Sequence, residues 1–192
     1  MNHRLRTVVF FFGVLVALAA VGLASGIAGR AANTVTHTDA ALGIAFDAPA
    51  DLLYSPATAG RFPYETTIAR LSSYRLDVPQ RPSDLRSQIL VEMRTVPRGN
   101  KSLAELADKW LDHSGPLVSR SYTVGGHQAY EAEGLFENGP RVVVLIEEDA
   151  PRLLVVELHP KDSMRRADFA STVASIRFLA PPNPNPTAAP TR

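Results

Sequence analysis

Cysteine is absent from this chain of 192 residues. Its absence excludes a disulfide framework, a thiolate metal site, a cysteine nucleophile and lipid attachment at an N-terminal cysteine. It does not decide the compartment, because a chain without cysteine is compatible with an oxidising environment but does not require one.

The chain also has little excess charge of either sign, since 20 lysines and arginines stand against 19 acidic residues. Arg4, Arg6 and Arg30 belong to an N-terminal segment without any acidic residue, so the remainder has 17 basic and 19 acidic residues. A nucleic-acid binder would carry a concentrated basic surface. The sequence therefore predicts no nucleic-acid partner.

An uncharged apolar run covers residues 7–29 and is long enough to cross a bilayer. Arg4 and Arg6 precede it, which predicts a single-pass anchor in the cell membrane, with the N-terminus cytoplasmic and the remaining chain extracytoplasmic. A cleaved signal peptide is the alternative, because residues 22–24 and 26–28 offer small residues at cleavage spacing. The protein would then be secreted or periplasmic.

Composition divides the chain into four parts. They are an N-terminal membrane anchor or signal peptide over residues 1–30, a linker over 31–36, a folded domain over 37–179 and a disordered proline-rich tail over 180–192.

Two helices are predicted in the folded domain. The first begins with Ser102 and Glu105 in the S-x-x-E spacing of a capping box, and its apolar residues recur at helical spacing until Gly115-Pro116. The second runs from about Ser163 to Ser175, with Asp162 or Ser163 as its cap. Its apolar face consists of Phe169, Val173 and Ile176.

Four strands are predicted between the helices: Leu117–Val124, His127–Phe136, Arg141–Glu148 and Arg152–His159. The first two alternate in polarity, and the last two are near-continuous apolar runs, as expected for strands covered on both faces. Gly125-Gly126 joins the first two strands by two residues, and no helix follows that could hold a phosphate at its N-terminus. The glycine pair therefore predicts a tight hairpin turn rather than a phosphate loop or part of a catalytic site.

Three earlier segments also have strand character: Ala41–Pro49, Glu65–Asp77 and Ser87–Pro97. In the second of them, the spacing of Ile68, Leu71 and Arg75 would also suit a helix, and both assignments remain open.

The sequence resembles the Mog1/PsbP-like superfamily, which includes bacterial exported proteins of the DcrB and LpqN types. The similarity rests on "LGIAFDAP" at residues 42–49, "VGGHQAYEAEG" at 124–134 and "ELHPKDSMRRADFASTVASIRF" at 157–178. It covers about residues 35–179 and implies an α+β fold, an antiparallel β-sheet flanked by helices, here preceded by the N-terminal transmembrane or signal helix. Family members serve as binding or assembly modules, and the resemblance implies no catalytic residue.

Two features depart from the family pattern. Many members have an aromatic residue, commonly tryptophan, soon after the early proline, where this chain has "DLLY" at residues 51–54. The lipid-anchoring cysteine of many bacterial members is missing as well.

No residue pattern predicts a catalytic, cofactor-binding or metal-binding site. The five histidines have none of the close spacings of zinc ligands. They are His3, His37, His113, His127 and His159. The chain also lacks the G-x-S-x-G and S-x-x-K motifs of serine nucleophiles.

Acidic residues are frequent in the four-strand region. They are Glu131, Glu133, Glu137, Glu147, Glu148, Asp149 and Glu157. A two-residue Asn138-Gly139 turn would place Glu131 opposite Ile146, and a three-residue turn would place it opposite Glu147. Whether Glu131, Glu133 and Glu147 converge on a cation site therefore remains open.

The sequence thus predicts a non-catalytic binding or assembly module without a cofactor. It would dock an envelope protein or another cell-envelope component through an exposed sheet edge or the loop Asp77–Ser87, with residues 7–29 in the membrane. The alternatives are a hydrolase or metal-dependent enzyme that uses the acidic residues, and a carrier of a small apolar ligand between sheet and helix.

Overall fold

The folded part of the chain is known here from a computed structural model. The model describes residues 33–57, 68–79, 86–110, 118–136, 139–148 and 152–180. The chain divides into a unit Met1–Thr34 and a unit Val35–Arg192, and the second is called the folded unit. The expected anchor or signal helix lies outside the described residues. Within them, no helix is long and apolar enough to cross a membrane.

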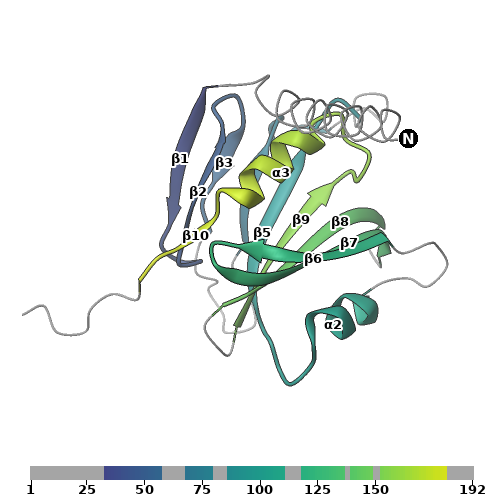
Figure 1. Ribbon diagram of the computed structural model, residues 1–192. Coiled ribbons are helices and arrows are strands. Elements are labelled where there is room, and N and C mark those ends of the chain that lie inside the picture. Colours follow the sequence, from purple (N-terminus) through teal and green to yellow (C-terminus); the bar gives the residue numbers. More distant parts are fainter. Residues whose placement is uncertain are drawn as a thin grey trace, which may run out of the picture. The chain divides into compact units, whose positions relative to one another are not determined.

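The folded unit is α+β and consists mainly of antiparallel strands in two sheets (Figure 1). The larger sheet contains β3 (Leu53–Ser55), β4 (Ile68–Ser72), β5 (Leu90–Pro97), β6 (Val118–Val124), β7 (His127–Phe136), β8 (Gly139–Glu147) and β9 (Arg152–His159). Its order is β3-β4-β5-β9-β8-β7-β6. The smaller sheet has the order β1-β2-β10 and contains β1 (Thr34–Asp39), β2 (Ile44–Pro49) and β10 (Arg177–Phe178).

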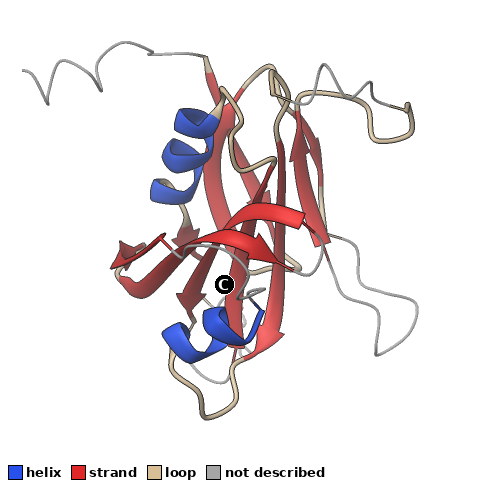
Figure 2. Ribbon diagram, turned by 90° about the vertical axis from the view of Figure 1, so that its right-hand side faces the viewer, coloured by secondary structure: helices blue, strands red, loops and turns tan. Residues whose placement is uncertain are grey.

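A helix covers part of each face of the larger sheet (Figure 2). α2 (Leu103–Trp110) packs on β7 and β8, whereas α3 (Arg166–Ala174) packs between β2 and β9. Successive residues of a strand point to opposite faces, so Val144 joins the core beneath α3 and Val143 joins the core beneath α2. The two apolar layers explain why β8 and β9 read as continuous apolar runs.

The predicted capping box at the start of α2 is confirmed. The Ser102 hydroxyl accepts a 3.2 Å hydrogen bond from the backbone N–H of Glu105, and the Glu105 carboxylate accepts a 2.8 Å bond from the backbone N–H of Ser102. Two N–H groups that the first turn would leave without partners are thereby satisfied.

The second helix exists, but its predicted start and cap were wrong. α3 begins at Arg166, and its N-cap residue Arg165 makes no side-chain capping bond. Ser163 instead donates its hydroxyl to the carbonyl of Gln88 at 2.7 Å and accepts the N–H of Arg165 at 3.1 Å. Ser163 therefore bonds to the segment before β5, a long-range contact, and does not cap α3 as its position in the sequence had predicted. The predicted apolar face is buried, with Phe169, Val173 and Ile176 each no more than 2% exposed.

The Gly125-Gly126 hairpin is confirmed. Both glycines have positive φ, 58° and 87°, as primed two-residue turns require. The turn also packs against β10, because a Cβ on Gly125 would lie 2.8 Å from the carbonyl oxygen of Ile176 and 3.4 Å from the ring of Phe178. Glycine is therefore needed at position 125 for space as well as for conformation.

Both registers expected for β7 and β8 were wrong. Gly139, assigned from the sequence to the turn, is the first residue of β8 and pairs with Phe136. The connection is therefore residues 137–138, and Glu131 lies opposite Val144 rather than Ile146 or Glu147. Compared with the register expected for a two-residue Asn138-Gly139 turn, β8 is shifted by two positions against β7. Each side chain therefore stays on its expected face of the sheet but has a different partner.

The segment that also suited a helix is a strand, since Ile68–Ser72 pairs with β3 on one side and β5 on the other. Three short strands were not predicted. They are β1, β3 and β10. β1 overlaps the expected linker of residues 31–36, because "TVTHTD" is polar and mostly exposed and so lacks a clear strand signal.

Candidate functional site

The histidines of the described residues lie apart from one another. His37 packs on Tyr54 with 4.4 Å between ring centroids, and burial lowers its pKa below the usual value. His127 packs on Phe178 with a centroid distance of 4.3 Å. His159 lies in a charged group discussed below. His3 and His113 are outside the described residues.

Glu131 and Glu133 face α3 and are bound by basic side chains. Arg166 approaches Glu133 to 2.6 Å and Glu131 to 3.6 Å. Glu131 also accepts a 2.8 Å bond from Arg120, and Glu133 accepts a 3.1 Å bond from Lys161. Burial alone would raise the pKa of Glu133, but the bonds from Arg166 and Lys161 lower it. These carboxylates tie the start of α3 to the sheet.

The remaining acidic residues of the four-strand region do not join this group. Glu147 faces the α2 side and pairs with Arg98, and buried Glu148 forms an ion pair with Arg152, whose Nε lies 3.0 Å from Oε2 of the carboxylate. Glu131, Glu133 and Glu147 therefore do not converge on a cation site. Glu137 and Asp149 lie outside the described residues.

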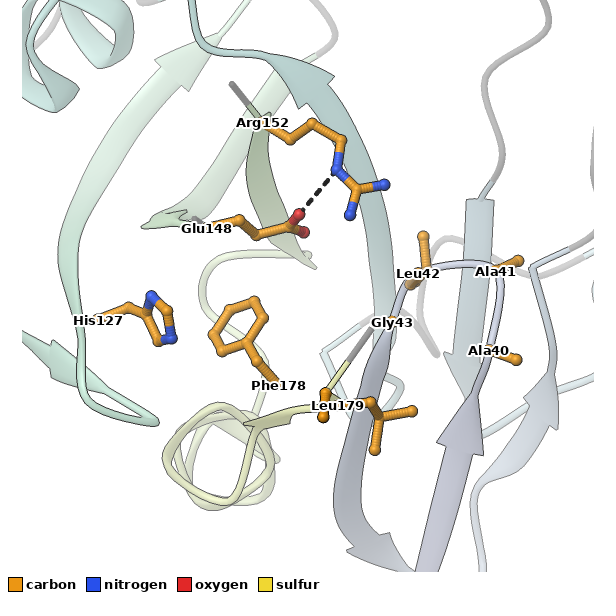
Figure 3. A pocket seen from close by; sticks show the side chains of 10 residues that line it. Ala40, Ala41, Leu42, Gly43, His127, Glu148, Arg152, Phe178 and Leu179 are labelled. Atoms are coloured by element: carbon orange, nitrogen blue, oxygen red, sulfur yellow. Dashed lines mark ion pairs between the residues drawn. The ribbon is translucent and has the colours of Figure 1, made fainter. Parts of the chain in front are cut away.

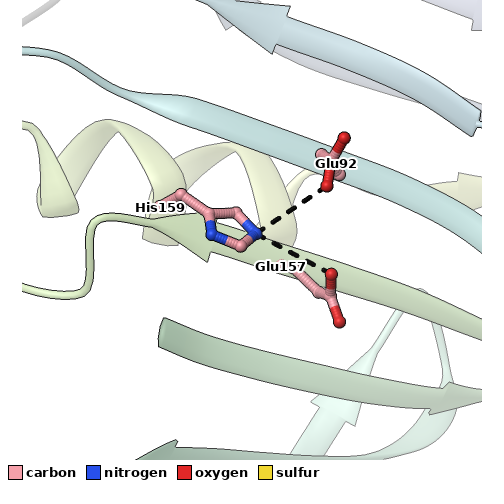
Figure 4. A group of neighbouring side chains, drawn as sticks. All are labelled: Glu92, Glu157 and His159. Carbon is pink, nitrogen blue, oxygen red and sulfur yellow. Dashed lines mark ion pairs between the residues drawn. The ribbon is translucent and has the colours of Figure 1, made fainter. Parts of the chain in front are cut away.

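Glu157 belongs to a different group, which the pairing of β5 with β9 creates. Glu92 lies directly opposite Glu157 in this pairing. The Nε2 atom of His159 is 3.8 Å from an oxygen of each carboxylate (Figure 4). Among the described residues, these three side chains are the one group whose ligand atoms lie close enough together for a metal ion.

Arginines already occupy both carboxylates of this group. Arg94 donates two 2.9 Å bonds to Glu157, Arg141 donates a third at 3.2 Å, and Arg70 donates a 2.8 Å bond to Glu92. Burial alone would raise the pKa of Glu157, but its interactions with His159, Arg94 and Arg141 lower it to about 2.

Charge balance then decides what this group can do. Three guanidinium groups face two carboxylates, so a divalent cation would have to displace arginines from their hydrogen bonds. Arginines thus hold both oxygens of Glu157 and one oxygen of Glu92, and a metal ion would have to compete with them. The group is an ion-pair network within the sheet, in which the buried Nε of Arg141 and Nε2 of His159 have no hydrogen-bond partner among the described residues.

A second buried carboxylate organises the turn between β1 and β2. Asp39 is 2% exposed. One of its oxygens accepts the backbone N–H groups of Ala41 and Leu42 at 3.1 and 3.0 Å. The other accepts the Tyr54 hydroxyl at 2.7 Å and the Ala57 N–H at 2.8 Å. Four donors to one side chain fix this turn against the segment around β3.

This turn forms one wall of a pocket of about 490 Å³ (Figure 3). The other walls come from the start of β7, the end of β10 and the residues at the β8–β9 connection. The pocket combines apolar side chains with a charged pair. The lining side chains of most interest are Leu42, Phe178, Leu179, His127, Glu148 and Arg152.

The outer edge of β6 is the second candidate. β6 is the last strand of the larger sheet, and all of its residues except Tyr122 and Val124 are exposed, with Val118 at 64%. Its pairing closes with Val124 opposite His127 across a two-residue turn. In such a hairpin the closing pair is hydrogen-bonded, so Ser119, Ser121 and Thr123 direct their backbone N–H and C=O groups away from β7.

A groove of about 580 Å³ runs beside this edge on the α2 side. Its walls include Ser121 and Thr123 of β6, Tyr130 of β7 and Leu103 at the start of α2. The Arg98–Glu147 ion pair also lines it. Side chains of a strand added to β6 would alternate between this groove and the opposite face.

Sequence reasoning missed Asp39 and Arg152 at the pocket and Glu92 in the ion-pair network. Asp39 before a tight turn fits the Asx-turn preference and could have been noticed. Glu92 and Arg152 carry no local signal, because their partners depend on strand order and on which strand ends meet.

No protein-family model matches the chain, and no curated protein matches it significantly.

Proposed function

We propose that the folded unit is a non-catalytic docking module that receives an extended segment of another protein along β6. In this proposal residues 7–29 anchor the chain in the membrane, the folded unit is extracytoplasmic, and the partner is a protein of the cell envelope. The fold would be of the Mog1/PsbP-like kind. The order of parts supports this assignment: the hairpin meander is followed by a helix that packs on the sheet.

The observation that carries the proposal is the open edge of β6. Alternate residues of this strand direct backbone groups outward, and none of them is paired with another described strand. An extended peptide can satisfy such groups by adding one more strand, and pockets for its alternate side chains then provide specificity. The groove beside Ser121 and Thr123 can receive the alternate side chains of such a peptide.

An enzyme using the acidic residues receives no comparable support. Within the described residues, the acidic side chains of the four-strand region are engaged by arginine or lysine, as are Glu92 and Glu157. A general acid or base must be within hydrogen-bond reach of a substrate proton, and here basic side chains already lie against the carboxylates. A ligand carrier is favoured by one observation, the pocket at the β1–β2 turn.

The test is site-specific photocrosslinking of the full-length protein in its native membrane. A photoreactive side chain at exposed Ser121 should crosslink one partner at stoichiometric yield, whereas the same side chain at exposed Ser171 on α3 should not. Ser171 is the matched control because it is also an exposed serine in a regular element.

A second variant tests the proposed strand addition directly. Thr123→Pro removes an outward N–H without removing a bond to β7, since proline is tolerated on sheet edges. It should weaken partner binding about tenfold and leave the unfolding midpoint within a few degrees of the parent. Crosslinking that is equal at both positions, or binding that survives the proline in a folded protein, would refute docking at β6.

A further inference from the structure

We propose that the pocket at the β1–β2 turn binds a small amphipathic carboxylate. Its acid group would bind the terminal nitrogens of Arg152, and its apolar body would lie against Leu42, Phe178 and Leu179 (Figure 3). This second site shares no lining residue with the β6 groove and does not depend on the docking function.

The ion pair in the pocket prepares Arg152 for an anion. Glu148 is the buried partner, with a side chain 6% exposed, while the Arg152 side chain is 55% exposed. The Nε atom of Arg152 lies 3.0 Å from Oε2 of Glu148, and this ion pair holds the guanidinium group beside the pocket. Among the described residues the guanidinium group of Arg152 has no second ion-pair partner, and Figure 3 shows its terminal nitrogens directed toward the Leu42 side of the pocket.

The apolar side of the pocket is formed before any ligand arrives. Leu42 is 1% exposed and belongs to the turn that Asp39 holds. The backbone N–H of Leu179 donates to the carbonyl of Gly43 at 2.8 Å, which joins the end of β10 to the same turn. On the far side the ring of His127 supports Phe178. A preformed pocket keeps the entropic cost of binding low.

The charges select the class of ligand. A planar carboxylate can accept two parallel N–H bonds from a guanidinium fork, which a neutral alcohol cannot match. An amine would bring a second cation to Arg152, whose carboxylate partner is already engaged. Glu148 also offsets the charge of Arg152, so a singly charged acid suits the site better than a doubly charged phosphate. The volume of about 490 Å³ is within the usual range of small-ligand sites.

The first experiment is a titration of the full-length protein in lipid nanodiscs with hexanoate, observed by saturation-transfer NMR. The short chain keeps partitioning into lipid weak. Hexanol and hexylamine serve as probes with the same body and a different head group. Hexanoate should bind saturably, and the other two should bind about tenfold more weakly or not at all. Equal binding of all three, or no saturable binding of hexanoate, would overturn the proposal.

Variants then place the ligand. Arg152→Gln should weaken hexanoate binding about tenfold or more, and Arg152→Lys should restore part of it, since a point charge replaces the fork. Ala41→Phe should block binding by filling the pocket from an exposed position. Arg75→Gln is the control, because Arg75 is an exposed arginine paired with a carboxylate outside the pocket. Each variant is first checked for a native unfolding midpoint. Hexanoate binding that Arg152→Gln and Ala41→Phe leave unchanged would refute the site.

Discussion

At the scale of single residues, Asp39 has the most demanding role in the fold. Its two oxygens receive four donors from three places in the chain, and nearly all of it is buried. Asparagine has almost the same shape, but one oxygen becomes an NH₂ group that would face donors instead of accepting from them.

Asp39→Asn should therefore lower the free energy of unfolding by about 2 kcal/mol, the cost of leaving buried donors without an acceptor. The measurement is urea denaturation followed by circular dichroism. Asp77→Asn is the matched control, because Asp77 pairs with Arg75 at a site where both side chains are mostly exposed, and it should change stability little. Equal losses in the two variants would contradict the assigned role of Asp39.

Glu157 makes stability depend on pH. The pKa of Glu157 is about 2 in the folded protein, whereas the ordinary value for a glutamate is 4.5, so the folded state favours the ionised form. The resulting stabilisation is present above pH 4.5 and is lost as the pH falls toward 2.

Glu157→Gln should lose about 3 kcal/mol at pH 7 and show a flatter decline of stability in acid. Denaturation midpoints measured from pH 7 down to pH 2 provide the check. Asp162→Asn, at an exposed ion pair with Arg86, should keep the steep acid decline of the parent. A parallel decline in Glu157→Gln would show that the acid sensitivity arises elsewhere.

Local rules predicted some of these residues and could not predict others. Ser102 with Glu105, and Gly125 with Gly126, act on neighbours within a few positions, so their spacing in the sequence is sufficient. Glu92 and Glu157 meet only because β5 pairs with β9. No spacing within either strand indicates that pairing.

At the scale of elements, the β6–β7 turn combines two constraints that can be separated. Gly125 and Gly99 have similar φ values of 58° and 63°. A Cβ at Gly99 would meet no atom within 4 Å, whereas one at Gly125 would meet the Ile176 carbonyl at 2.8 Å.

Both Gly→Ala variants should be destabilised by about 1 kcal/mol from backbone strain. Gly125→Ala should lose about 1–3 kcal/mol more, because the turn and β10 must move apart. Thermal unfolding of the two variants measures the difference. Equal losses would mean that the contact between the turn and β10 adjusts without cost.

Elements with strong patterns were predictable, and short ones were not. The runs of β8 and β9 are buried on both faces, and their sequences show it. β10 has two residues and β3 has three, so neither is long enough to show the alternation of apolar and polar residues that marks a strand. The turn between β7 and β8 was misplaced because Gly139 is acceptable both in a turn and as the first residue of a strand.

At the scale of the whole folded unit, the two proposed sites should act independently. The pocket lies at the β1–β2 turn and the docking edge lies on β6, and no residue lines both. A ligand that binds only the folded state stabilises it, by about 2.7 kcal/mol at a concentration one hundred times its Kd.

Saturating hexanoate should therefore raise the Tm of the parent protein and of Thr123→Pro by the same amount, and should raise that of Arg152→Gln clearly less. Differential scanning calorimetry on the full-length protein gives all three values. A smaller shift in Thr123→Pro would show that the edge and the pocket are coupled, contrary to this expectation.

The α+β class with antiparallel strands could be predicted from the sequence, but the division into two sheets could not. The second sheet consists of β1, β2 and β10. Its β10 strand has only two residues, Arg177 and Phe178, and pairs with β2, which lies far away in the sequence. The pocket depends on the same pairing, since it lies where β10 reaches the β1–β2 turn.

The position of β5 in the larger sheet also has a consequence for synthesis. β5 lies between β4 and β9, and β6, β7 and β8 all come between β5 and β9 in the chain. A chain that folds as it emerges on the far side of the membrane therefore keeps one side of β5 open until β9 has crossed. An open strand is a site for wrong pairing, so chaperone binding to the emerging chain should be strongest over this interval and should end when β9 emerges.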